Sequence, residues 1–586
     1  MLRRFLTPIA SLILLLVSLP VQAVETALDA VSTDASLVIR FKKPKATLAK
    51  AADLADLVVK GAGEQVRGAE SKLGEAISNP TLGGVDMEAD WFVAMYTDDD
   101  EDDDGKKDDD ADDDPTFVFI VPATDLAKMK EAVGSSFKFM EHGKFGVYTS
   151  DDATAKWTAK RLKGAGKSIA TIIDKESNTV FESGDLSVFI NVKQLVGDYK
   201  AELGKLQEDV QQRLEAIPDN AIGGMSSQQL SDIGGQILKL ASEGLGDAQS
   251  CTIAAVISKA GLAFEDLIKV KSGSSTDKML AKSPAGSLST LHSLPAGYLG
   301  YLGFTWDMTE VSKLSQWMMG AGAAKLKPET AKELEAALAE TSKLKISSLA
   351  TAFGLGDIDE GAIRTASITE VDSPAKLREL TLKIIKAMQN VENQGIKQTF
   401  DIKKDAEKYG KNMADVTTVK TEVVDLQDPI MAQMVRMTAT MFGSGGMTTR
   451  SVYLKDKMVQ TMGGGQQAMT DTLAALEQKP SESSQSPFQQ ARAKLGAKAN
   501  LVVLFDAPNT VAKIVDLVMQ SQAIPLPLDP EQVKNLQQKP SFFGLSAGTE
   551  PQGLRVKTQI PVEQMQGIAK IVNFVQQTLG GAGGEN

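Results

Sequence analysis

The sequence predicts an α+β fold made of two tandem, duplicated halves, in which helices pack on mostly antiparallel sheets. Three observations support this prediction. Short apolar runs lead directly into helical patterns, two strands often precede one helix, and the two patterns recur in the same order along the chain. Strict strand–helix alternation would instead favour a parallel sheet.

A strand that runs directly into a helix occurs four times. The four copies begin at Ala35 (ASLVIRFKK), Asp185 (DLSVFINVK), Ala296 (AGYLGYLGF) and Ala499 (ANLVVLFDA). A second pattern, of one or two strands and then a helix, occurs at 115–134, 362–385 and 553–575. Pro374 and Pro561 stand at the expected helix starts, where proline is favoured.

A third pair of segments links the two halves. FGVYTSDDATAKWTAKRL (145–162) resembles SVYLKDKMVQTMGGGQQAMTDTLAAL (451–476), and the same number of residues separates Asp152 from Asp185 as separates Gln466 from Ala499. Matched order and matched spacing indicate an internal duplication. The expected parts are a first half at 24–290, a second half at 291–586, a linker at 477–490 and a disordered tail at 579–586.

The first residues are typical of a secretory signal peptide. Arg3 and Arg4 precede the apolar run Phe5 to Leu19, and Val21 and Ala23 suit a cleavage site before Val24. The run is shorter than the ~20 residues that span a bilayer, and no later stretch is long and apolar enough to do so. We therefore predict that residues 1–23 are removed and that the mature chain is exported, to the periplasm or outside the cell.

Composition excludes some classes of function. The net charge is −13, and residues 98–114 alone contribute thirteen acids and two lysines, so the acidity is local. Without a basic stripe the chain is not expected to bind nucleic acid. The one cysteine, Cys251, lies in the apolar run SCTIAAVIS and cannot form an internal disulfide, so we expect a buried, inert thiol.

The acidic segment TDDDEDDDGKKDDDADDDP lies between WFVAMY (91–96) and FVFIV (117–121), which read as paired strands. It is therefore expected to be an insertion in a hairpin. Its spacing partly matches a calcium-binding loop, but Ala111 stands where a bidentate glutamate is required. Three interpretations remain: a solvated loop, a docking surface for a basic partner, and weak calcium binding by Asp100, Asp102, Asp104, Asp108 and Asp110.

A methionine-rich helix is predicted over DPIMAQMVRMTATMF (428–442). Asp428 and Pro429 suit its start, and Gly443 suits its end. One face of the helix would present Met431, Met434, Met437 and Met441. This face could pack in a core, line a groove for a lipid-like ligand or a partner helix, or hold copper(I) through thioethers.

The candidate cofactor-binding motif is incomplete. GAGKS (164–168) lacks both the first glycine and the preceding strand of a phosphate-binding loop. His142 and His292 are the only histidines, and both are expected to face solvent in a turn and a linker. The sequence therefore predicts no catalytic residues and no cofactor apart from weakly bound calcium.

The signal peptide, the duplicated halves and the motifs ASLVIRF, DLSVFINV and ANLVVLF together resemble large, uncharacterised exported bacterial proteins. The resemblance is one of general pattern, and it implies no functional residues.

The leading hypothesis is an exported, non-enzymatic protein that binds a small apolar ligand or an envelope protein. A more specific version of this hypothesis is a carrier of an apolar ligand. The alternatives are a secreted hydrolase that uses carboxylates and a calcium-responsive adhesion or matrix protein.

Overall fold

The computed structural model divides into two compact units, which are described separately. The first unit contains residues 1–212, 236–280 and 550–566, and the second contains residues 213–235, 281–549 and 567–586. The residues that the structure describes are 27–97, 115–134, 137–150, 152–163, 167–217, 227–305, 328–356, 361–387, 389, 391–393, 396–423, 439–443, 445–478, 486–521 and 530–580.

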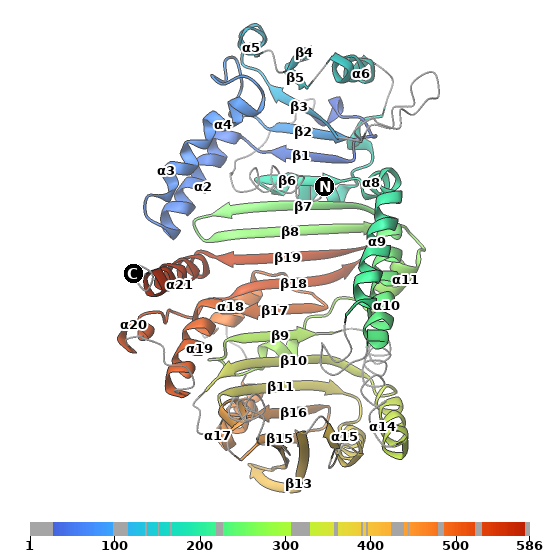
Figure 1. The fold of residues 1–586 in the computed structure, drawn as a ribbon, viewed down its shortest axis with the longest axis vertical. Helices are drawn as coiled ribbons and strands as arrows, with labels where there is room; N and C mark the ends of the chain where they lie inside the picture. The colour runs from blue at the N-terminus through green and yellow to red at the C-terminus, as the bar shows by residue number, and fades with distance from the viewer. Residues whose placement is uncertain are drawn as a thin grey trace. The chain divides into compact units, whose positions relative to one another are not determined.

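The α+β class is confirmed, because each unit contains one antiparallel sheet with helices beside it (Figure 1). The sheet of the first unit has the strand order β4 (Lys138–His142), β5 (Phe145–Thr149), β3 (Thr116–Pro122), β2 (Trp91–Tyr96), β1 (Leu37–Phe41), β6 (Leu186–Ile190), β7 (Ala248–Ser258), β8 (Gly261–Val270) and β19 (Gly553–Pro561).

Helices cover part of one face of this sheet, here called the back face. Val38, Val118 and Phe189 point to the back face and pack in a core with Ile169 and Phe181. The elements that supply this cover are η1 (Ala27–Ala30), α6 (Asp152–Lys163), η2 (Ile169–Thr171) and α7 (Lys175–Ser183).

The opposite, front face of the first sheet is covered only in part. Ile39 and Tyr148 point to the front face and are buried with Leu48, Leu73 and Met129. The covering helices are α2 (Pro44–Val58), α3 (Ala62–Arg67), α4 (Ala69–Ala76) and α5 (Leu126–Ala132). Four further helices follow later in the chain: α8 (Val192–Asp198), α9 (Lys200–Glu215), α10 (Ser227–Asp247) and α11 (Ser275–Lys282).

The sheet of the second unit is also antiparallel throughout its described pairs. Its strand order is β12 (Val391–Asn393), β13 (Ile396–Tyr409), β14 (Asn412–Val423), β15 (Met447–Tyr453), β16 (Lys457–Met462), β11 (Ile363–Val371), β10 (Ile346–Leu355), β9 (Gly300–Phe304), β17 (Leu501–Phe505) and β18 (Phe543–Glu550).

One face of the second sheet is buried in a core of its own. Leu291, Ala350, Ile368, Phe488 and Val502 meet in this core. We call this the back face of the second sheet. The helices with residues in the second unit are α12 (Ser289–His292), α14 (Pro328–Thr341), α15 (Pro374–Ala387), α17 (Gly465–Glu477), α18 (Pro487–Ala493), α19 (Ala507–Ser521), α20 (Pro530–Lys534) and the later part of α21 (Val562–Gly580).

Several local predictions are confirmed. Helix α15 begins at Pro374, as expected. Residues 396–423 form a long hairpin, which turns at Gly410. The strands beside the acidic segment pair with each other, with Tyr96 opposite Thr116. The segment itself, 98–114, lies outside the described residues, as does the signal peptide. Because α18 begins at Pro487, the predicted linker 477–490 overlaps the first turn of this helix.

The hairpin between β7 and β8 depends on a glycine. Gly261 has a φ of +124°, which side chains rarely allow, and an added Cβ would lie 2.1 Å from the carbonyl oxygen of Ile560. Gly261 pairs with Pro561 in β19, so this close approach is what lets the last strand of the chain join β8.

Candidate functional site

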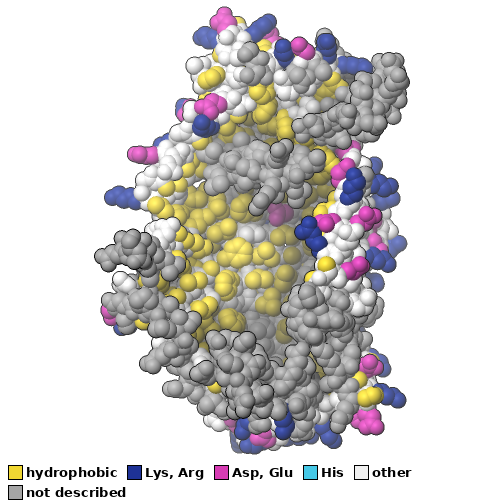
Figure 2. Space-filling model, viewed as in Figure 1, with side chains coloured by type: hydrophobic (Ala, Val, Ile, Leu, Met, Phe, Trp, Pro, Cys, Tyr) yellow, Lys and Arg dark blue, Asp and Glu magenta, His cyan; other side chains and the backbone are white. Residues whose placement is uncertain are grey.

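The front face of the first sheet leaves a set of apolar side chains half-exposed. Residues directly opposite each other in an antiparallel pair point to the same face, so the register identifies this set. We call it the first apolar face, and it contains Leu37, Ile190, Cys251, Ile253, Phe264, Ile268, Leu554 and Val556. Hydrophobic side chains gather over β7 and β8 in Figure 2, which agrees with this register.

Helix α2 covers the first apolar face at one end, where the hairpin joins β7 to β8. There Ile257 packs against Ala51 and Leu54 of α2, together with Leu262 and Met565. Further along the strands the apolar side chains are only half-buried. The face is thus an apolar surface with a closed end, which is the usual character of a ligand-binding surface.

One carboxylate lies within the first apolar face. Asp266 in β8 is paired directly with Ile253 of β7 and Val556 of β19, and Phe264 and Ile268 precede and follow it on the same face. Burial, and then the neighbouring charge of Glu265, raise the pKa of Asp266. A carboxylate is expensive to place among apolar groups, so this position needs an explanation.

Cys251 in β7 also belongs to the first apolar face, and it is half-buried, so the expected burial is only partial. Burial, and then the charge of Asp266, raise the pKa of its thiol from 9.0 to about 11. The thiolate is the reactive form, so the environment makes Cys251 a poor nucleophile at neutral pH.

This pKa shift predicts slow alkylation of Cys251. At pH 8 iodoacetamide should modify the folded protein at least about 100-fold more slowly than the urea-unfolded chain, because the thiolate fraction falls tenfold per pKa unit. Mass spectrometry of timed samples measures the alkylation rate, and equal rates in the folded and unfolded protein would contradict the prediction.

The raised pKa also means that the thiol's contribution to stability is complete below about pH 9 and is lost as the pH rises to about 11.

The second sheet has a comparable apolar surface opposite its back face. Leu302 of β9, Phe353 of β10 and Phe505 of β17 are 37%, 36% and 37% exposed. The register places them on one face with half-buried neighbours. We call this set the second apolar face, and it contains Leu302, Leu349, Phe353, Leu501, Val503, Phe505, Phe543 and Leu545.

Two helices add exposed apolar side chains to the second unit. Val511 and Ile514 on α19 are 37% and 48% exposed, and Ile568, Val572 and Val575 on α21 are 46%, 46% and 43% exposed. Spacings of three and four residues place each set on one side of its helix. The second unit therefore exposes apolar side chains on two helices as well as on its sheet.

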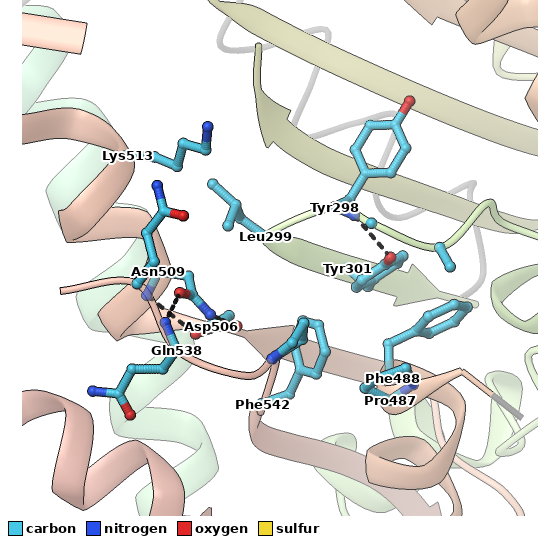
Figure 3. Close-up of a pocket in the computed structure, with 14 residues that line it drawn as sticks. Tyr298, Leu299, Tyr301, Pro487, Phe488, Asp506, Asn509, Lys513, Gln538 and Phe542 are labelled. Atoms are coloured by element: carbon cyan, nitrogen blue, oxygen red, sulfur yellow. Dashed lines mark hydrogen bonds between the residues drawn. The ribbon is translucent and has the colours of Figure 1, made fainter. Parts of the chain in front are cut away.

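A small cavity of about 200 Å³ lies at the start of β9 in the second unit (Figure 3). Its aromatic side consists of Tyr301, Phe488 and Phe542. The Tyr301 and Phe488 rings stack with centroids 4.0 Å apart, and Phe542 meets Tyr301 edge-on at 5.6 Å. The Tyr301 hydroxyl donates a hydrogen bond to the Pro295 carbonyl at 3.1 Å, so the aromatic side is held rigidly.

The polar side of this cavity is largely satisfied internally. Asp506 is the one acid among the residues that line it. Its carboxylate accepts hydrogen bonds from the Asn509 side chain at 2.7 Å and from the Ser541 backbone at 3.3 Å. It also accepts a hydrogen bond from the Asn509 backbone N–H at 3.3 Å and so stabilises the start of α19. The cavity offers no pair of acids for hydrolysis, and it is smaller than the usual small-molecule pocket.

The structure describes few of the residues predicted as sites. Met431, Met434 and Met437 lie outside the described residues, while Met441 is half-buried and the helix ends before Gly443, whose φ is +83°. The five acidic-segment residues, Asp100, Asp102, Asp104, Asp108 and Asp110, also lie outside. The methionine groove and the calcium site both stay predictions.

His292 differs from its prediction. It is half-buried in α12, and its carbonyl accepts a hydrogen bond from Gln489 at 3.0 Å, so it does not face solvent in a linker. Burial, and then the charge of Arg492, lower its pKa. The sequence missed this because three leucines nearby, Leu288, Leu291 and Leu294, bury the segment in the second core.

Sequence reasoning also missed Asp266. The signal was available, because Leu262, Phe264, Asp266 and Ile268 alternate at the period of a strand and so share one face.

Over the described ranges, no cluster of three His, Cys, Asp or Glu side chains could hold a metal ion. Nor does any helix within those ranges have the length and hydropathy needed to cross a membrane.

Comparison with known proteins gives no family for the chain. No family model matches it, and no curated protein matches it. A solved crystal form of the Treponema protein TP0453 aligns with a TM-score of 0.22 and 10% sequence identity, over 48% of this chain and 97% of that one. So distant a match supports no argument about fold or function.

Proposed function

We propose that the protein is an exported, non-enzymatic binding protein and that its ligand is apolar, such as a lipid. The observation that supports this proposal is the pair of apolar faces, where strand residues that would normally be buried point outward half-exposed. Exposed apolar surface costs about 25 cal/mol for each Å², and a ligand that covers it recovers this free energy. Soluble proteins seldom keep such contiguous surfaces without a partner.

Export is part of the proposal because of residues 1–23. A basic start, an apolar run and small residues at the cleavage site are the pattern of a signal peptide. An exported carrier would meet lipids or envelope proteins in the periplasm or outside the cell. Both partner classes fit the apolar faces.

We also propose that the two units descend from one duplicated ancestor. In the first unit the strands run β4, β5, β3, β2, β1, β6 and β7 across the sheet. In the second unit the matching strands run β15, β16, β11, β10, β9, β17 and β18. The two orders agree when β1 to β7 are matched in sequence with β9, β10, β11 and β15 to β18. The second unit has three additional strands, β12, β13 and β14, which pair beside β15. Duplication would explain why both units present an apolar face.

The second apolar face gives a direct test of binding. The wild-type protein should bind the neutral fluorescent probe N-phenylnaphthylamine, and the double substitution Leu302→Gln/Phe505→Gln should lower the bound amount at a subsaturating concentration by about half. The physical reason is that two amides on one of the two faces lose their water when the probe covers them. Fluorescence titration measures the bound amount.

The matched control is Met413→Gln on β14, because Met413 is 41% exposed and three strands, β15, β16 and β11, separate it from the second apolar face. It should leave probe binding unchanged. Native mass spectrometry of the protein isolated from its own host should show an added mass of lipid size. A bare chain that also fails to bind the probe would contradict the proposed function.

A further inference from the structure

Asp266 places a carboxylate among apolar side chains of the first sheet. Its strand presents Phe264 and Ile268 on the same face, and its direct partners across the sheet are Ile253 and Val556. All four are apolar and half-buried. The carboxylate therefore lies in the middle of the first apolar face.

Within the described ranges, no hydrogen bond or ion pair to the Asp266 carboxylate is found. The nearest acid, Glu265, points to the back face, where it pairs with Arg555 and with Lys557 at 3.2 Å. Those two cations are thus held on the opposite side of the sheet. The contrast shows that β8 has one acid with a structural partner and one without.

An ionised Asp266 is costly in the free protein. Burial, and then Glu265, raise its pKa, which means that the ionised carboxylate is less stable in the folded than in the unfolded chain. Its stability contribution is complete at low pH and is lost as the pH rises through the raised pKa. At neutral pH a carboxylate at this place lowers stability, as functional groups often do.

We propose that Asp266 selects, among apolar ligands, those that have a protonated amine at one end. The ammonium group would donate hydrogen bonds to the Asp266 carboxylate, and the alkyl chain would lie on the adjacent row Ile268, Cys251, Ile190 and Leu37. This row crosses three strand spacings, about 14 Å at ~4.8 Å each, which suits a medium-length alkyl chain. The inference rests on the proposed function, whose ligand class it narrows.

Charge complementarity distinguishes this ligand from the alternatives. An ammonium supplies the donor and the opposite charge that the carboxylate lacks, and such charge-assisted hydrogen bonds are strong in partly desolvated places. A neutral headgroup would cover the carboxylate and leave its charge uncompensated. An anionic headgroup would add repulsion between like charges.

Competition binding tests the selection. The protein with Leu302→Gln/Phe505→Gln is used, so that binding to the first apolar face dominates. Dodecylammonium, dodecanol and dodecyl sulfate, each below its micelle-forming concentration, compete with N-phenylnaphthylamine. Dodecylammonium should displace the probe at a concentration at least about tenfold lower than either of the others, as a charge-assisted hydrogen bond predicts. Asp266→Asn should abolish this preference and still bind the probe.

Glu265→Gln is the matched control, because it removes the same charge from the next residue on the opposite face. It should keep the preference for dodecylammonium. Equal competition by all three amphiphiles, or an equal loss of preference in both variants, would overturn the inference and leave the proposed function standing. Failure of every probe to bind the wild-type protein would overturn the proposed function and this inference with it.

Thermal unfolding separates a ligand role from a structural one. Asp266→Asn should raise the Tm of the ligand-free protein at pH 7, because the amide has no charge to desolvate. Dodecylammonium should raise the Tm of the protein with Asp266 and should have less effect on the Asn variant. A lower Tm for ligand-free Asp266→Asn would show that the carboxylate supports the fold and would overturn the inference.

Discussion

Replacement of Arg40 by alanine should lower the free energy of unfolding of the first unit by about 3–5 kcal/mol. Arg40 in β1 is 5% exposed. Its guanidinium donates to the Asp90 carboxylate at 2.9 and 2.6 Å and to the carbonyls of Phe181 and Glu182, both at 3.0 Å. The alanine variant removes these four hydrogen bonds at once, and part of this cluster is buried.

Urea unfolding followed by far-UV circular dichroism measures this loss. Arg40→Lys should recover only part of the stability, because an ammonium cannot reproduce the planar arrangement of guanidinium donors. The control is Lys45→Ala, which removes the exposed ion pair with Glu88 at 3.5 Å and should cost less than about 1 kcal/mol. If Arg40→Ala cost no more than this control, the buried cluster would not be stabilising the first unit.

Phe488→Ala should destabilise the second unit by a similar amount, about 3–5 kcal/mol. Phe488 is 2% exposed and stacks on Tyr301, whose hydroxyl also accepts a hydrogen bond from the Tyr298 backbone at 3.2 Å. Removal of the ring leaves a hole in the core beside the existing cavity. The surrounding residues cannot collapse freely, since Tyr301 is fixed by its hydrogen bonds.

Phe353→Ala is the informative comparison, because Phe353 is 36% exposed on the second apolar face. It removes the same ring and should cost less than about 1.5 kcal/mol, since much less apolar area returns to water. Both free energies come from urea unfolding. Equal losses for the two variants would show that the second apolar face is packed as tightly as the core.

Much of the local structure could be predicted from the sequence. The hairpin at 396–423, the start of α15 at Pro374 and the pairing of the strands beside the acidic segment all follow from alternation and from proline placement. These features depend on residues close together in the chain. Local patterns report such features because both the periodicity and the turn chemistry are local.

The candidate site could be predicted only in part. An apolar ligand was predicted from four methionines, three of which lie outside the described residues, so that prediction stays untested. The two apolar faces that the structure describes consist of strand residues. Alternation shows that Leu262, Phe264, Asp266 and Ile268 share a face. It does not show whether that face is covered by a helix or left open. This depends on elements distant in sequence, and no local pattern encodes it.

The sequence by itself determined the α+β class, the positions of many strands and helices, and the local character of the acidity. The tertiary structure decided that β19 pairs with β8. These strands lie far apart in the chain: Arg555 of β19 donates a hydrogen bond to Glu265 of β8 across a separation of 290 residues. That pairing places Val556 beside Asp266 and completes the apolar surroundings of the carboxylate. The physical reason is that a strand's period assigns each residue to one of two faces, whereas the strands and helices that pack around it determine what each face meets.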